Sequence, residues 1–250
     1  HSRFMCSSFS IVIKCPNYRD KVDLAPKNNE KKLCFRRDLV CTSQHTKTSL
    51  SCAYLRVLTM PSIDEKKRLL RIQAKLQRAE AFAINPQMGE QVCDQLLASK
   101  KLHNNQIVAV YWPLGDELDP MPLLNTLHSL GHQMVLPVML GAGKPLIFRT
   151  WCPTDELQAA GFGTREPSGD KQILEPDVIL APLLAFDSSG FRLGYGGGFY
   201  DRTLEKLRLN KPVSVYGIAY SAQEMDQVVK GPYDQPLDGI VTELGVTLFS

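Results

Sequence analysis

The sequence contains no apolar run long enough to cross a membrane, and this excludes a membrane-spanning helix. Cysteine is also sparse in most of the chain, because only Cys93 and Cys152 lie after residue 59. The total of seven is odd and shows no repeated C-x-x-C spacing, which argues against a disulfide framework or a structural zinc site. Residues 60–250 therefore have the cysteine content of a reduced protein, and we expect a cytoplasmic location.

Histidine is scarce as well, with five in 250 residues. The sequence indicates no Ser-His-Asp or Cys-His arrangement for nucleophilic catalysis. His128 and His132 are four residues apart, but they lie on either side of a helix end predicted at Gly131. That placement makes them a poor pair of metal ligands.

Acidic residues are few at the start of the chain. Residues 1–59 carry 11 Lys and Arg against 4 Asp and Glu, whereas residues 60–250 carry 18 against 22. The basic excess, a net charge of +3 for the whole chain, therefore comes from the first 59 residues. The remainder has no overall positive charge that would favour binding to nucleic acid.

Residues 1–59 also lack a sustained helical or strand period. We expect this leader to lie outside the globular unit, and we expect residues 60–250 to form a single domain. A transit peptide is the functional alternative, because the segment is basic and rich in serine. Its four acidic residues and the lack of a clear amphipathic helix weaken that alternative.

From Met60 onward, helical and strand patterns alternate. Ser62 and Glu65 form a capping box, and the helix predicted after it runs to about Phe82. Its apolar stripe consists of Leu69, Ile72, Leu76 and Ala79. Further helices are predicted at 86–98, 120–130, 155–160, 200–209 and 223–229. Strands are predicted at 107–111, 134–138, 145–151, 178–185, 213–219 and 239–242. This order predicts a three-layer α/β fold, Rossmann-like, with a mostly parallel sheet and helices on both faces.

The most informative stretch is a glycine-rich loop between the apolar run 178–185 and the helix predicted from Tyr200. Four of the five residues from Gly194 to Gly198 are glycine. Glycines leave backbone N–H groups uncovered and permit positive φ, and a helix N-terminus carries a partial positive charge. The loop therefore suits a phosphate, although it is neither a dinucleotide fingerprint nor a P-loop. Asp201, directly after it, is either a helix-dipole partner or a magnesium ligand.

Arg192-Leu193-Gly194-Tyr195-Gly196-Gly197-Gly198-Phe199-Tyr200-Asp201 closely resembles the glycine-loop signature of the 5-formyltetrahydrofolate cyclo-ligase family. Three other segments match in the expected order. Lys67 and Arg71 resemble the family's basic pair on the first helix. Asp116-Glu117 resembles its substrate acid. Asp234 resembles its second magnesium ligand, in an Asp-x-x-x-Asp run that ends at Asp238. The resemblance covers about residues 60–244 and leaves out the leader.

The resemblance implies an enzyme that uses MgATP to convert 5-formyltetrahydrofolate to 5,10-methenyltetrahydrofolate, and an architecture grouped with sugar-phosphate isomerases and coenzyme A transferases. The implied catalytic residues are Lys67, Arg192 and Tyr200. The implied ATP-binding residues are Lys67, Arg71, Arg192, Leu193, Gly194, Tyr195, Gly196, Gly197, Gly198, Phe199 and Tyr200. The implied folate-binding residues are Trp112, Glu117, Tyr195, Gly196, Gly197, Gly198 and Phe199. Asp201 and Asp234 would hold Mg²⁺. The expected partners are ATP and a reduced folate, with or without a polyglutamate tail. We expect no nucleic acid and no membrane as partners, and we expect a monomer.

Two other functions stay open on the sequence. A sugar-phosphate isomerase or coenzyme A transferase would share the architecture, and fold alone does not separate it from a ligase. It would not need a basic first helix together with a magnesium-binding acid after the glycine loop. A folate- or nucleotide-binding protein without turnover is the non-enzymatic alternative.

Overall fold

The computed structural model describes residues 61–249. The predictions made for residues 1–59 lie outside this range. The described part contains four α-helices, α1 (Ile63–Ile84), α2 (Met88–Ala98), α3 (Met121–Ser129) and α4 (Phe199–Asn210). None of its helices combines the length and the apolar character that a membrane crossing requires.

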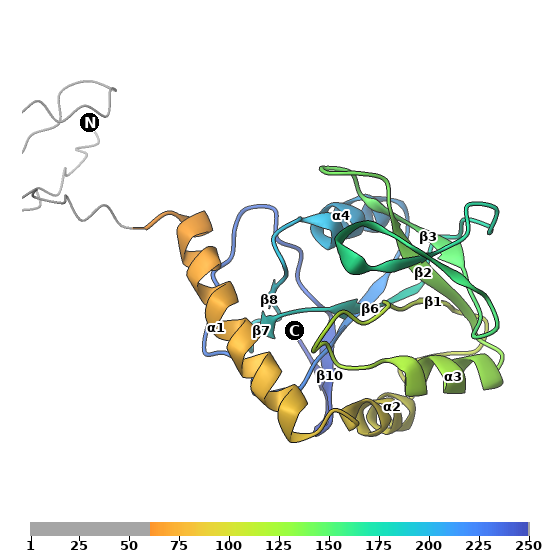
Figure 1. Ribbon diagram of the computed structural model, residues 1–250, viewed down its shortest axis with the longest axis horizontal. Helices are drawn as coiled ribbons and strands as arrows, with labels where there is room; N and C mark the ends of the chain where they lie inside the picture. The colour runs from red at the N-terminus through yellow and green to blue at the C-terminus, as the bar shows by residue number, and fades with distance from the viewer. Residues whose placement is uncertain (1–60, 250) are drawn as a thin grey trace, which may run out of the picture. The chain divides into compact units, whose positions relative to one another are not determined.

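The main sheet has seven strands, and the spatial order of the strands differs from their order in the chain (Figure 1). The order is β11 (Gly245–Leu248), β10 (Gly239–Thr242), β9 (Ser214–Ile218), β6 (Val178–Pro182), β1 (Ile107–Ala109), β2 (Gln133–Met139) and β3 (Leu146–Thr150). The five central strands are parallel, and the two edge strands β11 and β3 are antiparallel to their neighbours. The predicted mostly parallel α/β sheet is therefore confirmed.

Helices cover both faces of the sheet. Successive residues of a strand point to opposite faces, so neighbouring residues of β6 pack into different apolar clusters. In β6, Leu180 packs into the cluster that contains Leu96 of α2 and Leu127 of α3. Ile179, its neighbour in the strand, packs into the cluster that contains Leu204 of α4. Figure 1 shows α2 and α3 on one side of the sheet and α4 on the other. The predicted three-layer arrangement is confirmed.

The first helix begins as the sequence predicts, because the Ser62 side chain accepts a hydrogen bond from the Glu65 backbone N–H at 3.2 Å. The face of α1 that packs on the domain is not the predicted apolar stripe. Leu69, Ile72 and Leu76 are each more than half exposed. The buried face instead carries Ala74, Arg78 and Ala81. Ala74 packs with Leu184, Ala185, Leu193 and Val228.

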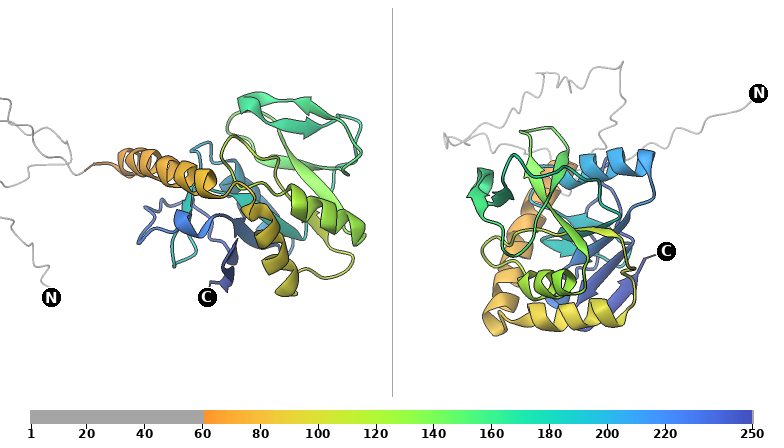
Figure 2. Two further views of the ribbon diagram at one scale, coloured as in Figure 1. Left: turned by 60° about the horizontal axis from the view of Figure 1, so that its bottom comes forward. Right: turned by 90° about the vertical axis from the view of Figure 1, so that its right-hand side faces the viewer.

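Short antiparallel ribbons replace several segments that were predicted otherwise. Residues 155–160, predicted as a helix, contain strand β4 (Leu157–Ala159), which pairs with β5 (Arg165–Pro167). Ala185–Phe186 (β7) pairs with Arg192–Leu193 (β8), so the glycine loop is anchored by a strand pair next to α1 (Figures 1 and 2). The helix predicted at 223–229 is wrong, because only the single 3₁₀ turn Ser221–Gln223 forms there. β4 and β5, like β7 and β8, pair across a short connection, whereas Glu224 bridges to the distant Phe186. In each case strand pairing overrides the local pattern.

Candidate active site

A cavity of about 640 Å³ opens at the carboxyl ends of the parallel strands. Tyr111 and Trp112 follow β1, Met139 ends β2 and Pro182 ends β6, and all four line the cavity. Ligands of open α/β sheets bind at this edge. Every site residue predicted from the sequence lies on the cavity wall: Lys67, Arg71, Trp112, Glu117, Arg192, Leu193, Gly194, Tyr195, Gly196, Gly197, Gly198, Phe199, Tyr200, Asp201 and Asp234.

The glycine loop leads directly into the N-terminus of α4. Gly198 precedes the helix with φ +64°, and Gly196 has φ +105°. Both values lie in the region that favours glycine, so side chains at these positions would strain the loop. Gly198, Phe199 and Tyr200 line the cavity, which places the positive end of the α4 dipole at its wall. This arrangement can bind an anionic group such as a phosphate.

Two basic residues of α1 extend to the same wall. The Arg71 Nε atom donates a hydrogen bond to the Gly194 carbonyl at 2.9 Å, which ties the helix to the glycine loop. Lys67, one turn earlier, forms an ion pair with Asp234, and both side chains are mostly buried. The Asp234 carboxylate also accepts a hydrogen bond from the Gly231 N–H at 2.7 Å. Two basic side chains therefore lie on the same cavity wall as the glycine loop.

Arg192 and Asp201 form a second ion pair, 2.8 Å between Nη2 and Oδ1. The other Arg192 nitrogen, Nη1, donates to the Gln235 carbonyl at 2.7 Å, and the Gln235 N–H donates to Asp201 at 3.1 Å. Burial lowers the pKa of Arg192 from its usual value, and Asp201 opposes that shift. These contacts bring the segment 234–235 next to α4.

The predicted metal ligands thus share one cavity. One carboxylate oxygen of Asp201 accepts a hydrogen bond from Arg192, and one of Asp234 accepts a hydrogen bond from Lys67. Within residues 61–249, no group of three or more His, Cys, Asp or Glu side chains is arranged to hold a metal. Two carboxylates are nevertheless the share that a protein supplies when phosphate oxygens complete the shell of Mg²⁺. The donor set fits a magnesium ion that arrives with a phosphate ligand.

Glu117 also lines the cavity and is 5% exposed. Its Oε1 atom accepts a hydrogen bond from the Tyr195 hydroxyl at 2.8 Å, and its Oε2 atom accepts one from the Leu114 N–H at 2.8 Å. Burial raises the pKa of Glu117 from its usual value, although these hydrogen bonds and the nearby Arg78 oppose the shift. A buried carboxylate with fixed orientation can recognise ring N–H groups of a flat ligand.

The sequence model of the 5-formyltetrahydrofolate cyclo-ligase family matches residues 63–243. The chain belongs to the 5-formyltetrahydrofolate cyclo-ligase family. Its activity is that of the family, the conversion of 5-formyltetrahydrofolate to 5,10-methenyltetrahydrofolate, with a nucleotide as co-substrate. The prediction made from the glycine-loop signature is confirmed.

Curated cyclo-ligases and solved structures agree with this assignment. The 5-formyltetrahydrofolate cyclo-ligase of Escherichia coli is 35% identical over 162 residues, which are 62% of this chain and 88% of that protein. The Haemophilus influenzae enzyme is 31% identical over 186 residues, which are 71% of this chain and 97% of that protein. The NMR structure of 5,10-methenyltetrahydrofolate synthetase from Aquifex aeolicus matches with a TM-score of 0.61 and 27% identity, covering 73% of this chain and 92% of that one.

Sequence reasoning missed part of this cyclo-ligase cavity. Phe162, on the connection between β4 and β5, lines the cavity with φ +59° and is 83% exposed. Its ring meets that of Phe199 edge to face at 6.4 Å. Trp112 has a similar contact with the buried Trp151 at 6.3 Å. No local pattern marks Phe162, because its position depends on the β4–β5 pairing.

Arg78 is a second residue that the sequence reasoning missed. It lies behind the cavity wall, where Nη1 donates to the Tyr195 hydroxyl at 2.6 Å and Nη2 donates to Asp116 at 2.5 Å. The sequence alone could have indicated Arg78 as a site residue. It follows Arg71 by seven residues, or two helical turns, and therefore lies on the same face of α1.

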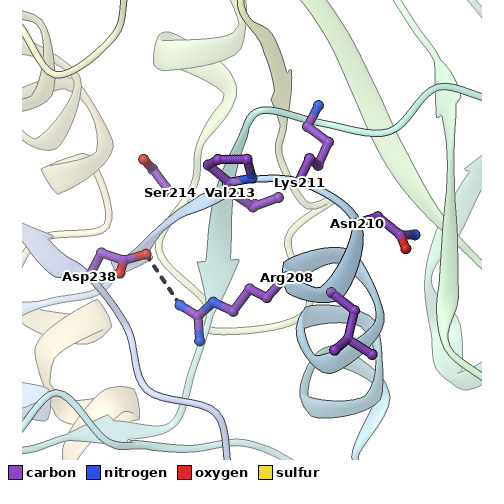
Figure 3. A pocket seen from close by; sticks show the side chains of 8 residues that line it. Arg208, Asn210, Lys211, Val213, Ser214 and Asp238 are labelled. Carbon is purple, nitrogen blue, oxygen red and sulfur yellow. Dashed lines mark hydrogen bonds and ion pairs between the residues drawn. The ribbon is translucent and has the colours of Figure 1, made fainter.

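A second hollow lies at the other end of α4, near the start of β9 (Figure 3). Arg208 and Asp238 form an ion pair there at 3.3 Å. The Asp238 carboxylate also accepts a hydrogen bond from the Val215 N–H at 2.7 Å. Asp238 therefore anchors β9 and takes no part in the cyclo-ligase cavity, unlike Asp234 four residues earlier.

Proposed function

We propose that the chain closes the methenyl ring by phosphoryl transfer from ATP to the formyl oxygen of 5-formyltetrahydrofolate. The neighbouring nitrogen of the folate then attacks the activated formyl carbon and loses its proton. The carbon–oxygen bond breaks, and the oxygen leaves with the phosphate. The products are 5,10-methenyltetrahydrofolate, ADP and phosphate. One observation carries this proposal: a single cavity is lined by a helix N-terminus that can bind an anion, by the buried Glu117 carboxylate and by the half-buried Trp112 ring.

The side of the cavity near α4 suits the triphosphate. Lys67, Arg71 and Arg192 supply positive charge, and the backbone from Leu193 to Tyr200 supplies N–H groups at the helix N-terminus. Phosphoryl transfer requires positioning and charge neutralisation more than covalent chemistry, and this wall offers both. The ion pairs with Asp234 and Asp201 would hold the Lys67 and Arg192 side chains in place before the nucleotide binds.

Asp201 and Asp234 are proposed to hold Mg²⁺, together with phosphate oxygens of ATP. The ion would neutralise charge on the transferred phosphoryl group. Each carboxylate already has a cationic neighbour, Arg192 or Lys67. The protein would therefore keep these acids oriented toward the cavity when no metal is bound.

The opposite side suits the folate. Trp112 provides an aromatic face on which a flat pterin ring can stack, and Glu117 can accept hydrogen bonds from the ring edge. Tyr195 is bonded to Glu117, and Gly196, Gly197, Gly198 and Phe199 follow it on the cavity wall, so we propose that they contact both substrates. The formyl oxygen would then lie beside the glycine loop.

Tyr200 is proposed as a catalytic hydrogen-bond donor together with Lys67 and Arg192. It lines the cavity, and burial raises its pKa well above the usual value. The negative charge of Glu117 adds to this shift, and Arg192 opposes it. Tyr200 therefore remains protonated at neutral pH and can donate to an oxygen near the reacting centre.

The test is a turnover assay in which ADP release is measured with and without 5-formyltetrahydrofolate, and the methenyl product is followed by its absorbance. We expect ADP release that depends on the folate and matches product formation mole for mole. ADP release that does not depend on the folate, or product formation without ATP, would contradict the phosphoryl-transfer route. Isomerase or coenzyme A transferase activity in place of ring closure would support the rival function.

Four further expectations stay predictions. Residues 60–250 should form the complete cyclo-ligase unit. Its location should be cytoplasmic, and its folate should be accepted with or without a polyglutamate tail. The chain should be a monomer, which light scattering can test. The exposed row of Leu69, Ile72 and Leu76 on α1 is the surface on which self-association would be sought first.

A further inference from the structure

Arg78 is a charged residue that the proposed reaction does not use, yet it is 4% exposed. It projects from the buried face of α1, the helix that also carries Lys67 and Arg71. It does not line the cavity, whereas its neighbours Glu117 and Tyr195 do. Burying a guanidinium is costly unless it is fully paired, so this position requires an explanation.

The contacts of Arg78 form a branched network behind the folate side of the cavity. Nη2 pairs with Asp116 at 2.5 Å. Nη1 donates to the Tyr195 hydroxyl at 2.6 Å and lies 3.5 Å from a Glu117 oxygen. The Tyr195 hydroxyl in turn donates a hydrogen bond to Glu117 at 2.8 Å. Arg78 is thus the one side chain in this network that contacts the other three.

Each contact has a separate consequence. Asp116 balances the charge of Arg78, so the buried pair adds little net charge to the wall. Because the Tyr195 hydroxyl accepts from Arg78, its hydrogen must point to Glu117. That direction fixes Glu117 as an acceptor, and an acceptor is what a ring N–H group requires.

We propose that Arg78 is the positioning residue for folate recognition, holding Tyr195 and Glu117 in the orientation that accepts the ring edge. This inference rests on the proposed function, because it assumes that Glu117 and Tyr195 face the folate. Since Arg78, Arg71 and Lys67 share one face of α1, this helix sets the folate side and the phosphate side together. A shift of α1 would disturb both sides at once.

The network also controls the ionisation of Glu117. Burial raises the pKa of Glu117, and Arg78 and the Tyr195 hydroxyl oppose the shift. Removing the guanidinium removes part of that opposition, so the pKa of Glu117 rises further. The titratable and charged groups that face Glu117 are Arg78, Asp116, Tyr111, Tyr195 and Tyr200. Of these, Arg78 is the basic group.

The experiment compares Arg78→Met with wild type in the turnover assay. We expect the KM for 5-formyltetrahydrofolate to rise about 10- to 100-fold, the scale of one lost charge-assisted hydrogen bond. The KM for ATP should change by less than about twofold, since Arg78 does not reach the phosphate side. The acidic limb of kcat/KM for the folate should move to higher pH. Arg68→Met is the matched control, because Arg68 lies on the same helix, is exposed and pairs only with Glu65 among the described residues.

Two further variants separate positioning from simple loss of structure. Arg78→Lys keeps the charge but cannot contact Tyr195 and Asp116 as a fork, so it should raise the folate KM while leaving the acidic limb near its wild-type pH. Tyr195→Phe combined with Arg78→Met should cost less than the product of the two single effects, because Arg78 acts through Tyr195. This cycle can also be built on Arg78→Lys if Arg78→Met does not fold.

Equal increases in both KM values with an unmoved acidic limb, or multiplicative effects in the cycle, would overturn the role of Arg78. Either result would leave ATP-dependent ring closure by the wild-type chain untouched. Failure of that wild-type assay would instead overturn the proposed function itself, so the two failures are distinguishable.

Discussion

A Cβ atom built on Gly196 would lie 3.1 Å from the Cζ atom of Arg71. The glycine loop and the first helix are therefore in direct contact, although 125 residues separate them in the chain. Two requirements meet at Gly196, a positive φ of +105° and space for a guanidinium. The same Arg71 side chain donates to the Gly194 carbonyl. The basic helix and the loop form one structural unit.

Gly196→Ala should accordingly impair the enzyme strongly. The alanine would be strained at this φ and would displace Arg71, so we expect the KM for ATP to rise at least about tenfold and the protein to lose about 1–2 kcal/mol of stability. Steady-state kinetics and thermal unfolding provide the measurements. Gly169→Ala is the matched control, because Gly169 has an ordinary φ and nothing lies within 4 Å of the added Cβ. Similar kinetics in the two variants would contradict the contact.

Asp201→Asn tests the proposed magnesium site. Asparagine keeps the shape and removes the charge. We expect kcat/KM to fall roughly a hundredfold, which corresponds to about 3 kcal/mol of lost transition-state stabilisation, and the magnesium requirement to rise. Arg192, which is buried beside Asp201, will also lose its ion pair. The magnesium dependence of turnover is therefore the readout that separates metal binding from stability.

Asp238→Asn is the matched control for that experiment. Asp238 belongs to the same Asp-x-x-x-Asp run as Asp234 but lies away from the cavity and anchors β9 through Val215. We expect lower thermal stability and an unchanged magnesium requirement. A magnesium dependence that stays at the wild-type level in Asp201→Asn would remove Asp201 from the metal site.

Lys67→Ala and Arg71→Ala test the phosphate side. Each should raise the KM for ATP by at least about tenfold while leaving folate binding largely intact, because both residues line the cavity beside the α4 N-terminus. Arg71→Lys keeps the charge but loses the directional bond to Gly194, so a clear defect in it would indicate a need for the guanidinium geometry.

Arg68→Ala provides the comparison, since an exposed charge of this kind changes stability by no more than about 0.5 kcal/mol. Unchanged ATP dependence in Lys67→Ala and Arg71→Ala would assign both residues to an ordinary solvated surface.

Deletion of residues 1–59 tests the predicted boundary of the enzymatic unit. The sequence of this segment has no helical or strand period, and the family match begins at residue 63. We therefore expect the shortened chain to keep its thermal unfolding temperature and turnover. Insolubility or loss of activity on deletion would show that the segment contributes to the folded enzyme.

The sequence by itself determined the class of fold and most of the cavity. The buried runs and helical periods predicted the alternation of strands and helices, because each element must bury an apolar face whatever its neighbours are. The glycine loop indicates a phosphate site by its own residues, because it leads into a helix N-terminus. Lys67, Arg71 and Asp201 were assigned to that site by the resemblance to the cyclo-ligase family, since an i, i+4 basic pair or an acid in a first helical turn is locally also an ordinary surface charge.

Only the tertiary structure decided which face of α1 is buried. Its apolar stripe, with Leu69 and Leu76, is exposed, and its charged face packs on the domain. Periodicity could not show this, because the burial of Arg78 depends on partners 38 and 117 residues away, Asp116 and Tyr195. Phe162 was missed for a different reason, because it reaches the cavity through the pairing of β4 with β5, and the sequence predicted a helix at residues 155–160. Contacts between distant segments compensate the cost of burying charge, and a local pattern carries no record of them.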